Sequence, residues 1–170
     1  MNQNLFFTPT DILLPEHADM RRWSVIACDQ FTSDAAYWRA VQDTVGDAPS
    51  TLRLMLPEFY LGKCDEAAAT RAIQQTMHAY LEGGVFRTVP HSLVLVQRTL
   101  PSGAVRCGIV GALDLEAYDY APDSVTPIRA TEGTVASRLP ARVRIRAAAA
   151  LEMPHIMVFY TDPEDAICRK

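Results

Sequence analysis

Two stretches of the chain place apolar side chains at the three- and four-residue spacing of an amphipathic helix. Residues 33–45 carry the first stripe, and Gly46 follows it as a residue that commonly ends helices. Residues 65–82 carry the second stripe, which Gly83 closes. The stripes consist of Tyr37, Trp38, Val41 and Val45, and of Ala69, Ile73, Met77, Tyr80 and Leu81. The pattern therefore predicts two helices, each with one buried face.

Short apolar runs between turn-forming residues predict strands. They occupy residues 25–28, the segment 50–61 that Pro57 interrupts, and residues 155–160. Pro140 suits the first turn of a further helix, which we expect to continue to Leu151.

A hairpin is predicted over residues 92–113. Pro101 and Gly103 separate two apolar runs there, as in a tight turn between antiparallel strands. Because residues 93–96 are continuously apolar, we expect their strand to be covered on both faces by helices.

The alternation of helical and strand patterns favours the α/β (α+β) class. We expect a single domain over residues 1–170, with a mixed, partly antiparallel sheet flanked by helices, and a flexible stretch at residues 1–10. A chain of 170 residues that is 49% apolar is long enough to bury a core without covalent staples.

Composition excludes several classes of function. The four cysteines lack metal-ligand spacing, and no apolar stretch approaches the ~20 residues of a membrane span. We therefore expect a cytoplasmic protein that does not enter a membrane. A net charge of −4 argues against nucleic-acid binding, which needs a broad basic surface. No phosphate-loop or dinucleotide fingerprint is present.

One basic segment stands out against this acidic background. Residues 129–146 hold five arginines against one glutamate, a local charge of +4, so the rest of the chain sums to −8. Guanidinium groups bind phosphate through paired N–H donors, and hydroxyls and free amides at a helix N-terminus add to such a site. We name as candidate ligand-binding residues Arg129, Thr131, Gly133, Thr134, Arg138 and Arg142. The alternative is that the threonines cap a helix and the arginines lie solvated on its face.

Two carboxylates are candidates for catalysis. Glu132 lies between the two threonines and could act as a general base or as a magnesium ligand. Asp29 ends the first predicted strand, where α/β proteins often place functional groups. Alternatively, Asp29 competes with Thr32 and Ser33 to cap the following helix.

Two further groups have weaker support. Asp114, Glu116 and Asp119 could hold a hard cation, but they lack a full coordination pattern, which favours a solvated acidic loop. His155 could act as a base, or could be a hydrogen-bonded structural residue.

Five stretches, taken in order, resemble a bacterial family known as domain of unknown function 1015. They are VIACDQFTS, APSTLRLMLPE, DLEAYDY, IRATEGTVASRLPARVRIR and LEMPHIMVF. The resemblance covers about residues 10 to 163, and Ala141 stands where the family pattern has a second proline. Members are about twice as long or more, so the chain resembles their N-terminal portion. The family is also similar to ParB/sulfiredoxin-like folds, a group that includes nucleotide-binding proteins and free-serine kinases.

The arginine segment and the resemblance together lead to a hypothesis about function. We expect a phosphate- or nucleotide-binding phosphotransferase for small molecules, similar to free amino-acid kinases, that uses ATP or ADP with Mg²⁺. The alternatives are a non-catalytic module that senses a nucleotide or metabolite and, with less support, a nucleic-acid-binding protein. We also expect self-association through apolar surface that the remainder of the longer family members would cover.

Overall fold

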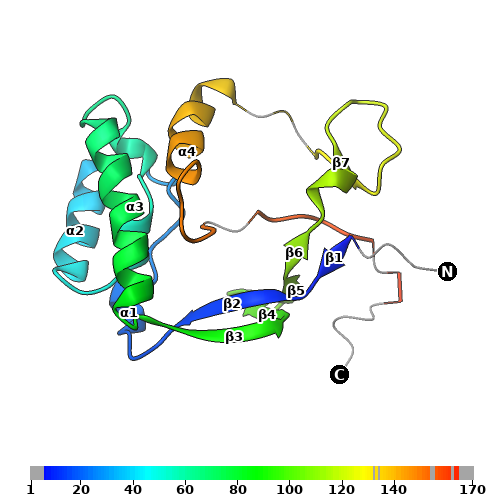
Figure 1. Cartoon of the computed structure of the whole chain (residues 1–170), viewed down its shortest axis with the longest axis horizontal. Helices are drawn as coiled ribbons and strands as arrows, with labels where there is room; N and C mark the ends of the chain where they lie inside the picture. The colour runs from blue at the N-terminus through cyan, green and yellow to red at the C-terminus, as the bar shows by residue number, and fades with distance from the viewer. Residues whose placement is uncertain (1–5, 132, 134, 154–155, 162, 165–170) are drawn as a thin grey trace. The chain divides into compact units, whose positions relative to one another are not determined.

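The computed structural model describes residues 6–131, 133, 135–153, 156–161 and 163–164. The chain forms two compact units. Unit 1 comprises residues 1–14, 88–134 and 158–170, and unit 2 comprises residues 15–87 and 135–157. The chain combines helices with short strand pairs, which confirms the predicted mixed α/β class (Figure 1). Most of the described strand pairs with an assigned direction are antiparallel. That residues 1–170 act as a single domain stays a prediction.

Helices build unit 2. The α-helices are α1 (Met20–Trp23), α2 (Ala35–Val45), α3 (Glu66–Glu82) and α4 (Leu139–Arg146). Three 3₁₀ turns accompany them: η1 (Thr51–Leu54), η2 (Glu58–Tyr60) and η4 (Ala136–Arg138). Both η1 and α4 pack on α3, which is therefore the central element of the unit.

The two predicted amphipathic helices are confirmed as α2 and α3. Each begins at an aspartate whose side chain accepts a hydrogen bond from a first-turn N–H: Asp34 from Tyr37, and Asp65 from Ala68. At the end of α2, Gly46 adopts φ +52°, a backbone conformation that side chains with a Cβ disfavour.

The core of unit 2 is formed by the stripes of these helices and by two tryptophans. Its fully or nearly buried apolar side chains are Trp23, Trp38, Val45, Leu54, Ile73, Met77, Tyr80, Ala141 and Leu151. Trp23 also contacts the ring of Phe86 edge-on, at 5.5 Å between ring centroids. One polar contact lies inside this core, where the backbone N–H of Ser50 donates to the Tyr80 hydroxyl at 3.0 Å.

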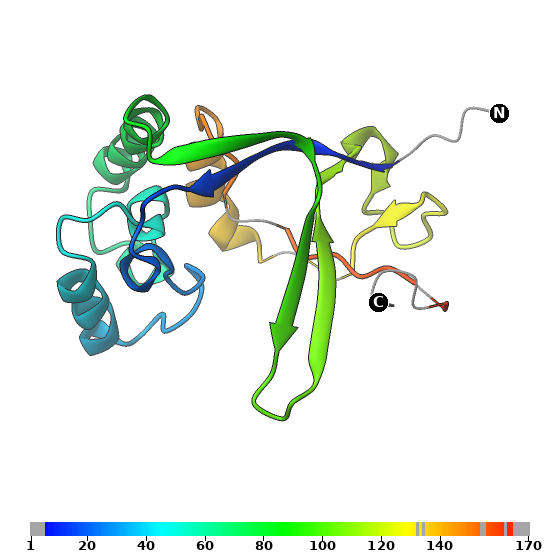
Figure 2. The same ribbon diagram turned by 90° about the horizontal axis from the view of Figure 1, so that it is seen from below.

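Strand pairs build unit 1, and the boundary between the units falls within β2 and β3. β1 (Phe7–Thr8) pairs antiparallel with β6 (Ala112–Leu113), and β2 (Thr10–Pro15) pairs with β3 (Phe86–Ser92). β4 (Val94–Thr99) and β5 (Val105–Val110) form the long antiparallel hairpin seen in Figure 2, which confirms the predicted hairpin. β7 (Tyr118–Asp119), which follows the turn η3 (Leu115–Ala117), runs parallel to β8 (Ile128–Arg129).

Residues 1–10 were expected to be flexible. Residues 7–8 of this stretch lie in strand β1, and residues 1–5 lie outside the described part.

Two strands predicted for the N-terminal half are wrong. Residues 25–28 form no ladder, because their backbone groups bond to other loops: Val25 N–H donates to the Thr51 hydroxyl, and Cys28 C=O accepts from Glu58. Residues 51–54 form the turn η1 instead of a strand. Its start is fixed by the Ser50 hydroxyl, which accepts from Leu52 N–H and offers the backbone an alternative to a ladder.

The C-terminal predictions are also corrected. The helix starting near Pro140 ends at Arg146 rather than Leu151. The Gln74 side-chain amide donates to the C=O groups of Arg144 and Ile145, which a longer helix would have used for its next turn. Residues 156–160 form no strand, since they pair with no described strand, and residue 155 lies outside the described part.

We expected helices to cover both faces of the hairpin strand, and this prediction is wrong. Leu95 is 63% exposed and Val96 is 44% exposed, and these neighbours point to opposite faces of the strand. The described helices of four or more residues all belong to unit 2, so unit 1 has no helix of its own to lay over the hairpin.

The buried Ser50–Tyr80 contact yields a prediction about stability. Tyr80→Phe should lower the free energy of unfolding by about 1–3 kcal/mol, because the Ser50 N–H would then be buried without a partner. Urea denaturation followed by circular dichroism measures this change. Tyr120→Phe is the matched control, because Tyr120 is 78% exposed and its replacement should change stability by less than about 0.5 kcal/mol. Equal effects of the two substitutions would contradict the structural role of Tyr80.

Candidate functional site

A tight loop in unit 2 positions Asp29. Just after Asp29, Phe31 adopts φ +51°, which is strained for a residue with a side chain. The Trp38 indole N–H donates to the Phe31 carbonyl at 3.0 Å, and the Tyr37 ring stacks on the Phe31 ring with centroids 4.0 Å apart. These contacts with α2 hold the loop in its strained conformation.

The same loop is tied to η2, which carries Glu58. The backbone N–H of Glu58 donates to the Cys28 carbonyl at 2.8 Å. Asp29 and Glu58 are therefore held near each other, although they are 29 positions apart in the sequence.

Two arginines converge on the Glu58 carboxylate. Arg142 Nη2 lies 2.8 Å from Glu58 Oε1, and Arg138 Nε lies 3.3 Å from Glu58 Oε2. Arg142 Nη2 also lies 3.8 Å from Asp29 Oδ2. The Glu58 side chain is only 9% exposed, whereas the arginine side chains are 45% and 47% exposed. Shielding a carboxylate from water costs free energy unless it is paired, and the two guanidinium groups supply that pairing.

Helix α4 is anchored so that these arginines keep their place. Arg138 and Arg142 are four residues apart, at the start and in the second turn of the helical segment, so they lie on one side of it. On α3, Glu66 forms an ion pair with Arg144, and Gln74 binds two backbone carbonyls of α4.

The arrangement leaves both arginine side chains partly open to solvent. Arg138 contacts Glu58 through Nε, and Arg142 contacts Glu58 and Asp29 through Nη2. Both side chains are nearly half exposed, so a ligand in solution can reach part of each. We call this group of Asp29, Glu58, Arg138 and Arg142 the arginine cluster. Planar guanidinium groups with free, fixed donors are suited to binding phosphate.

The thiol of Cys28 lies in the field of the arginine cluster. Burial raises its pKa, while the positive charge of Arg142 lowers it, and the carboxylates of Asp29 and Glu58 raise it further. The net effect is a raised pKa, so the thiol stays protonated to higher pH than an ordinary cysteine.

Three of the eight predicted site residues meet in the arginine cluster. They are Asp29, Arg138 and Arg142. Arg129 is exposed in β8 of unit 1, and Thr131 and Gly133 also belong to unit 1. No helix begins at Thr131 or Gly133, since the next element is η4. Glu132 and Thr134 lie outside the described residues.

The structure shows the local roles of several aspartates for which alternatives were open. Asp34, not Asp29, caps α2, so Asp29 is not needed for capping. In the acidic loop, Asp114 accepts from Glu116 N–H and Asp119 from Ala121 N–H, so both stabilise local turns. Over the described residues, no group of three or more His, Cys, Asp or Glu side chains is arranged to hold a metal ion. His155 lies outside them.

Sequence reasoning missed Glu58 as a site residue. It ends the stretch APSTLRLMLPE, one of those that carry the family resemblance, and three such stretches supply the arginine cluster. That resemblance was the available signal, because a single glutamate after a proline has no local pattern of its own.

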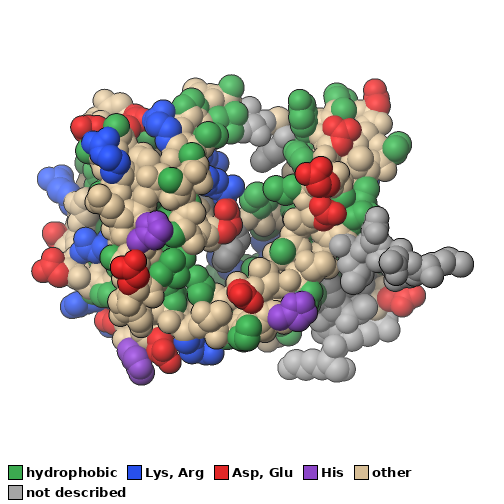
Figure 3. All heavy atoms as spheres, in the orientation of Figure 1, with side chains coloured by type: hydrophobic (Ala, Val, Ile, Leu, Met, Phe, Trp, Pro, Cys, Tyr) green, Lys and Arg blue, Asp and Glu red, His purple; other side chains and the backbone are tan. Residues whose placement is uncertain are grey.

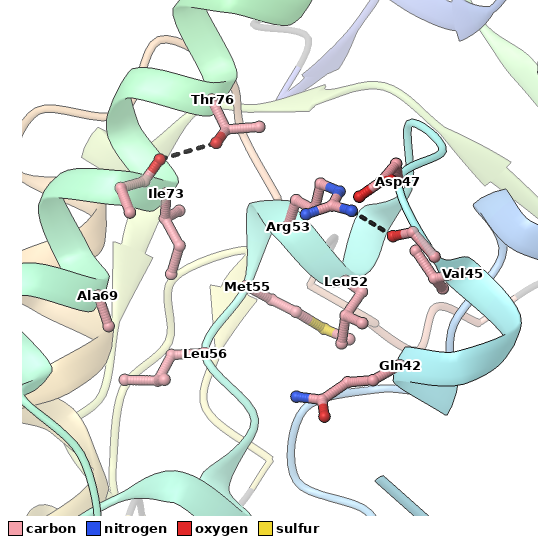
Figure 4. Close-up of a pocket in the computed structure, with 12 residues that line it drawn as sticks. Gln42, Val45, Asp47, Leu52, Arg53, Met55, Leu56, Ala69, Ile73 and Thr76 are labelled. Atoms are coloured by element: carbon pink, nitrogen blue, oxygen red, sulfur yellow. Dashed lines mark hydrogen bonds between the residues drawn. The ribbon is translucent and has the colours of Figure 1, made fainter. Parts of the chain in front are cut away.

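A groove of about 560 Å³ lies elsewhere in unit 2 (Figure 4). Its walls come from α2, the η1 region and α3, and apolar side chains such as Leu52, Met55 and Ile73 line it. Arg53 in this groove donates to the carbonyls of Gly46 and Ala48 and so closes the end of α2. Since Arg53 is occupied in this way, the groove offers less to an anion than the arginine cluster does.

Charge on the visible surface is mixed. Lys, Arg, Asp and Glu side chains are interspersed over the helices in Figure 3, so this face has no continuous basic surface for a nucleic acid. No described helix is both long and apolar enough to cross a lipid bilayer.

The central position of Glu58 yields a second prediction. Glu58→Gln should lower the free energy of unfolding by about 1–3 kcal/mol, because two guanidinium groups lose a charged acceptor that is largely shielded from water. Urea denaturation measures the loss, with Glu82→Gln at the exposed end of α3 as the control. An equal stability of wild type and Glu58→Gln would contradict the ion-pair geometry.

The third prediction concerns the ionisation of Cys28. Arg142→Ala should raise the pKa of Cys28 further, since it removes the charge that lowers it, and Glu58→Gln should reduce that pKa. The pH dependence of iodoacetamide alkylation, read at each cysteine by mass spectrometry, measures both shifts. The exposed Cys64 is the internal reference. If alkylation of Cys28 in Arg142→Ala instead shifts to lower pH, the proposed effect of the Arg142 charge on this thiol is contradicted.

Comparison with known proteins identifies the family of the chain. The family model described as protein of unknown function DUF1015 matches residues 9–170, which is almost the whole chain. Neither the curated proteins nor the solved structures contain a significant match. The chain therefore belongs to the DUF1015 family.

Proposed function

We propose that the protein binds a phosphate-bearing small molecule or nucleotide at Arg138 and Arg142. The observation that carries this proposal is the convergence of two half-exposed guanidinium groups on the shielded carboxylate of Glu58. Glu58 fixes the orientation of both groups, so little conformational entropy is lost when a ligand binds. Both side chains are nearly half exposed, and we propose that a phosphate accepts hydrogen bonds from their remaining N–H donors.

We further propose that the bound phosphoryl group is transferred to a small-molecule acceptor. Asp29 supports this step, because it lies 3.8 Å from Arg142 and is more exposed than Glu58. In the proposed step the acceptor hydroxyl oxygen attacks the γ-phosphorus of ATP, and its proton passes to the Asp29 carboxylate. The bond from that phosphorus to the bridging oxygen breaks, and ADP leaves. Mg²⁺ typically binds to one or two carboxylates together with nucleotide phosphates, and Asp29 offers such an oxygen.

Ligand binding is tested first, as the fourth prediction. Inorganic phosphate, pyrophosphate and ATP, each with and without Mg²⁺, should raise the melting temperature of the wild type. Arg138→Ala and Arg142→Ala should each weaken binding about tenfold to a hundredfold, the loss expected for charged hydrogen bonds. Arg71→Ala, which removes an exposed arginine of α3, is the matched control and should bind as the wild type does.

Because Arg138→Ala and Arg142→Ala also remove partners of Glu58, each variant is compared with its own ligand-free melting temperature. Cys28 supplies an independent readout. An anion bound to Arg142 offsets the charge that lowers the pKa of Cys28, so binding should slow alkylation of that thiol. Stabilisation that persists unchanged in both arginine variants, or no response to any of the probes, would refute the proposed site.

Turnover distinguishes the transferase from a sensing module. ATP or ADP is supplied with Mg²⁺ and free serine, the acceptor that the similarity to free-serine kinases suggests, and products are followed by ³¹P NMR. The transferase proposal expects a phosphate ester to form, and Asp29→Asn to abolish its formation while binding persists. Binding without consumption of nucleotide for serine and other hydroxyl acceptors would favour the sensing module.

A further inference from the structure

Unit 1 lacks a buried core among its described residues. Every described apolar side chain that is less than a tenth exposed belongs to unit 2. In contrast, exposed apolar side chains occur on both faces of the β4–β5 hairpin: Leu95 and Val105 on one face and Val96 on the other. A two-stranded ribbon with exposed apolar side chains and no core of its own is only marginally stable alone, so a second molecule that covers one face would stabilise it.

The hairpin also carries an uncompensated pair of positive charges. Arg98 of β4 and Arg106 of β5 are directly opposed in the antiparallel register, so their side chains lie on the same face. Both are exposed, and neither forms an ion pair with a described residue. Like charges directly opposite each other destabilise a hairpin. An external group of negative charge would remove this repulsion.

The register places apolar residues beside these arginines. Val94, Val96 and Val110 share a face with Arg98 and Arg106, and Gly108 lies opposite Val96. We call this face of the hairpin, formed by these six residues, the basic hairpin face. On this face Val96 is exposed and Val94 and Val110 are half-buried beside the two arginines, so its partner should carry apolar or aromatic groups next to carboxylates.

A segment of that composition lies in the same unit. Residues 115–123 expose Leu115, Glu116, Tyr118, Tyr120 and Asp123. Glu116 and Asp123 form no ion pair within the described part of the chain. Carboxylates complement the two arginines, and tyrosine rings pack against both valine side chains and guanidinium groups. We call residues 115–123 the acidic tyrosine segment.

We infer that unit 1 is a self-association module in which the basic hairpin face of one copy binds the acidic tyrosine segment of a second copy. When two copies exchange these contacts reciprocally, the dimer closes with two-fold symmetry and buries both surfaces twice. A direct pairing of two hairpins fits less well, because it would add arginines to arginines and leave the repulsion in place.

Paired charge reversals test this inference. The first variant carries Arg98→Glu and Arg106→Glu, which keeps a like-charge pair across the hairpin and so leaves the internal electrostatics of the ribbon comparable. The second carries Glu116→Arg and Asp123→Arg. The control carries Arg39→Glu and Arg71→Glu, two exposed arginines of α2 and α3.

Sedimentation velocity over a wide concentration range measures the result. The mass of the wild type and of the control should rise from 18.8 kDa towards twice that value. Each reversal variant alone should dimerise at least about tenfold more weakly, because like charges then face each other. An equimolar mixture of the two variants should restore the dimer, since both contacts regain opposite charges.

The mixing step also controls for misfolding, because an unfolded variant cannot be rescued by its counterpart. A wild type that stays monomeric throughout the concentration range would overturn the inference. So would a dimer that both reversals leave unchanged, or a mixture that remains monomeric while each variant gives the circular dichroism spectrum of the wild type. These outcomes do not depend on phosphate binding at Arg138 and Arg142.

Discussion

The arrangement of the candidate site depends on one carboxylate that is largely removed from water. The Glu58 side chain is largely shielded from water, and two guanidinium groups lie against it as its ion-pair partners. Its backbone holds the Cys28 carbonyl, and its side chain holds Arg138 and Arg142. Glu58 thereby joins an N-terminal loop to a helix more than 80 residues later in the chain. The same contacts fix the arginine donors that we propose to bind phosphate.

The two units bury their apolar side chains to different extents. Unit 2 packs Trp38 and Met77 into a closed core, and this core supports α3 and through it α4. Unit 1 consists of short strand pairs whose described apolar side chains are half-buried or exposed. The difference accounts for the division of roles that we propose: a rigid unit that holds a ligand, and a unit whose surfaces bind a second copy.

Sequence reasoning predicted those features that local patterns determine. Periodicity and flanking residues located α2, α3 and the β4–β5 hairpin, because spacing and turn chemistry act within a few residues. It failed where distant contacts decided the outcome. Residues 25–28 are bonded to other loops rather than to a strand, and Gln74 ends α4 early. The arginine segment drew attention to Arg138 and Arg142, but no local pattern singles out Glu58, because its contacts are with side chains 80 and 84 positions away.

The central claim is that Arg138 and Arg142, oriented by Glu58, form one anion site. Its most direct test is a titration with inorganic phosphate followed by NMR at the Nε–H resonances of the arginine side chains. We expect the resonances of Arg138 and Arg142 to shift together along one saturating curve. The resonances of Arg39 on α2 and Arg71 on α3 should stay in place. Shifts that are spread equally over the exposed arginines and do not saturate would contradict it, since they would show only nonspecific screening of charge.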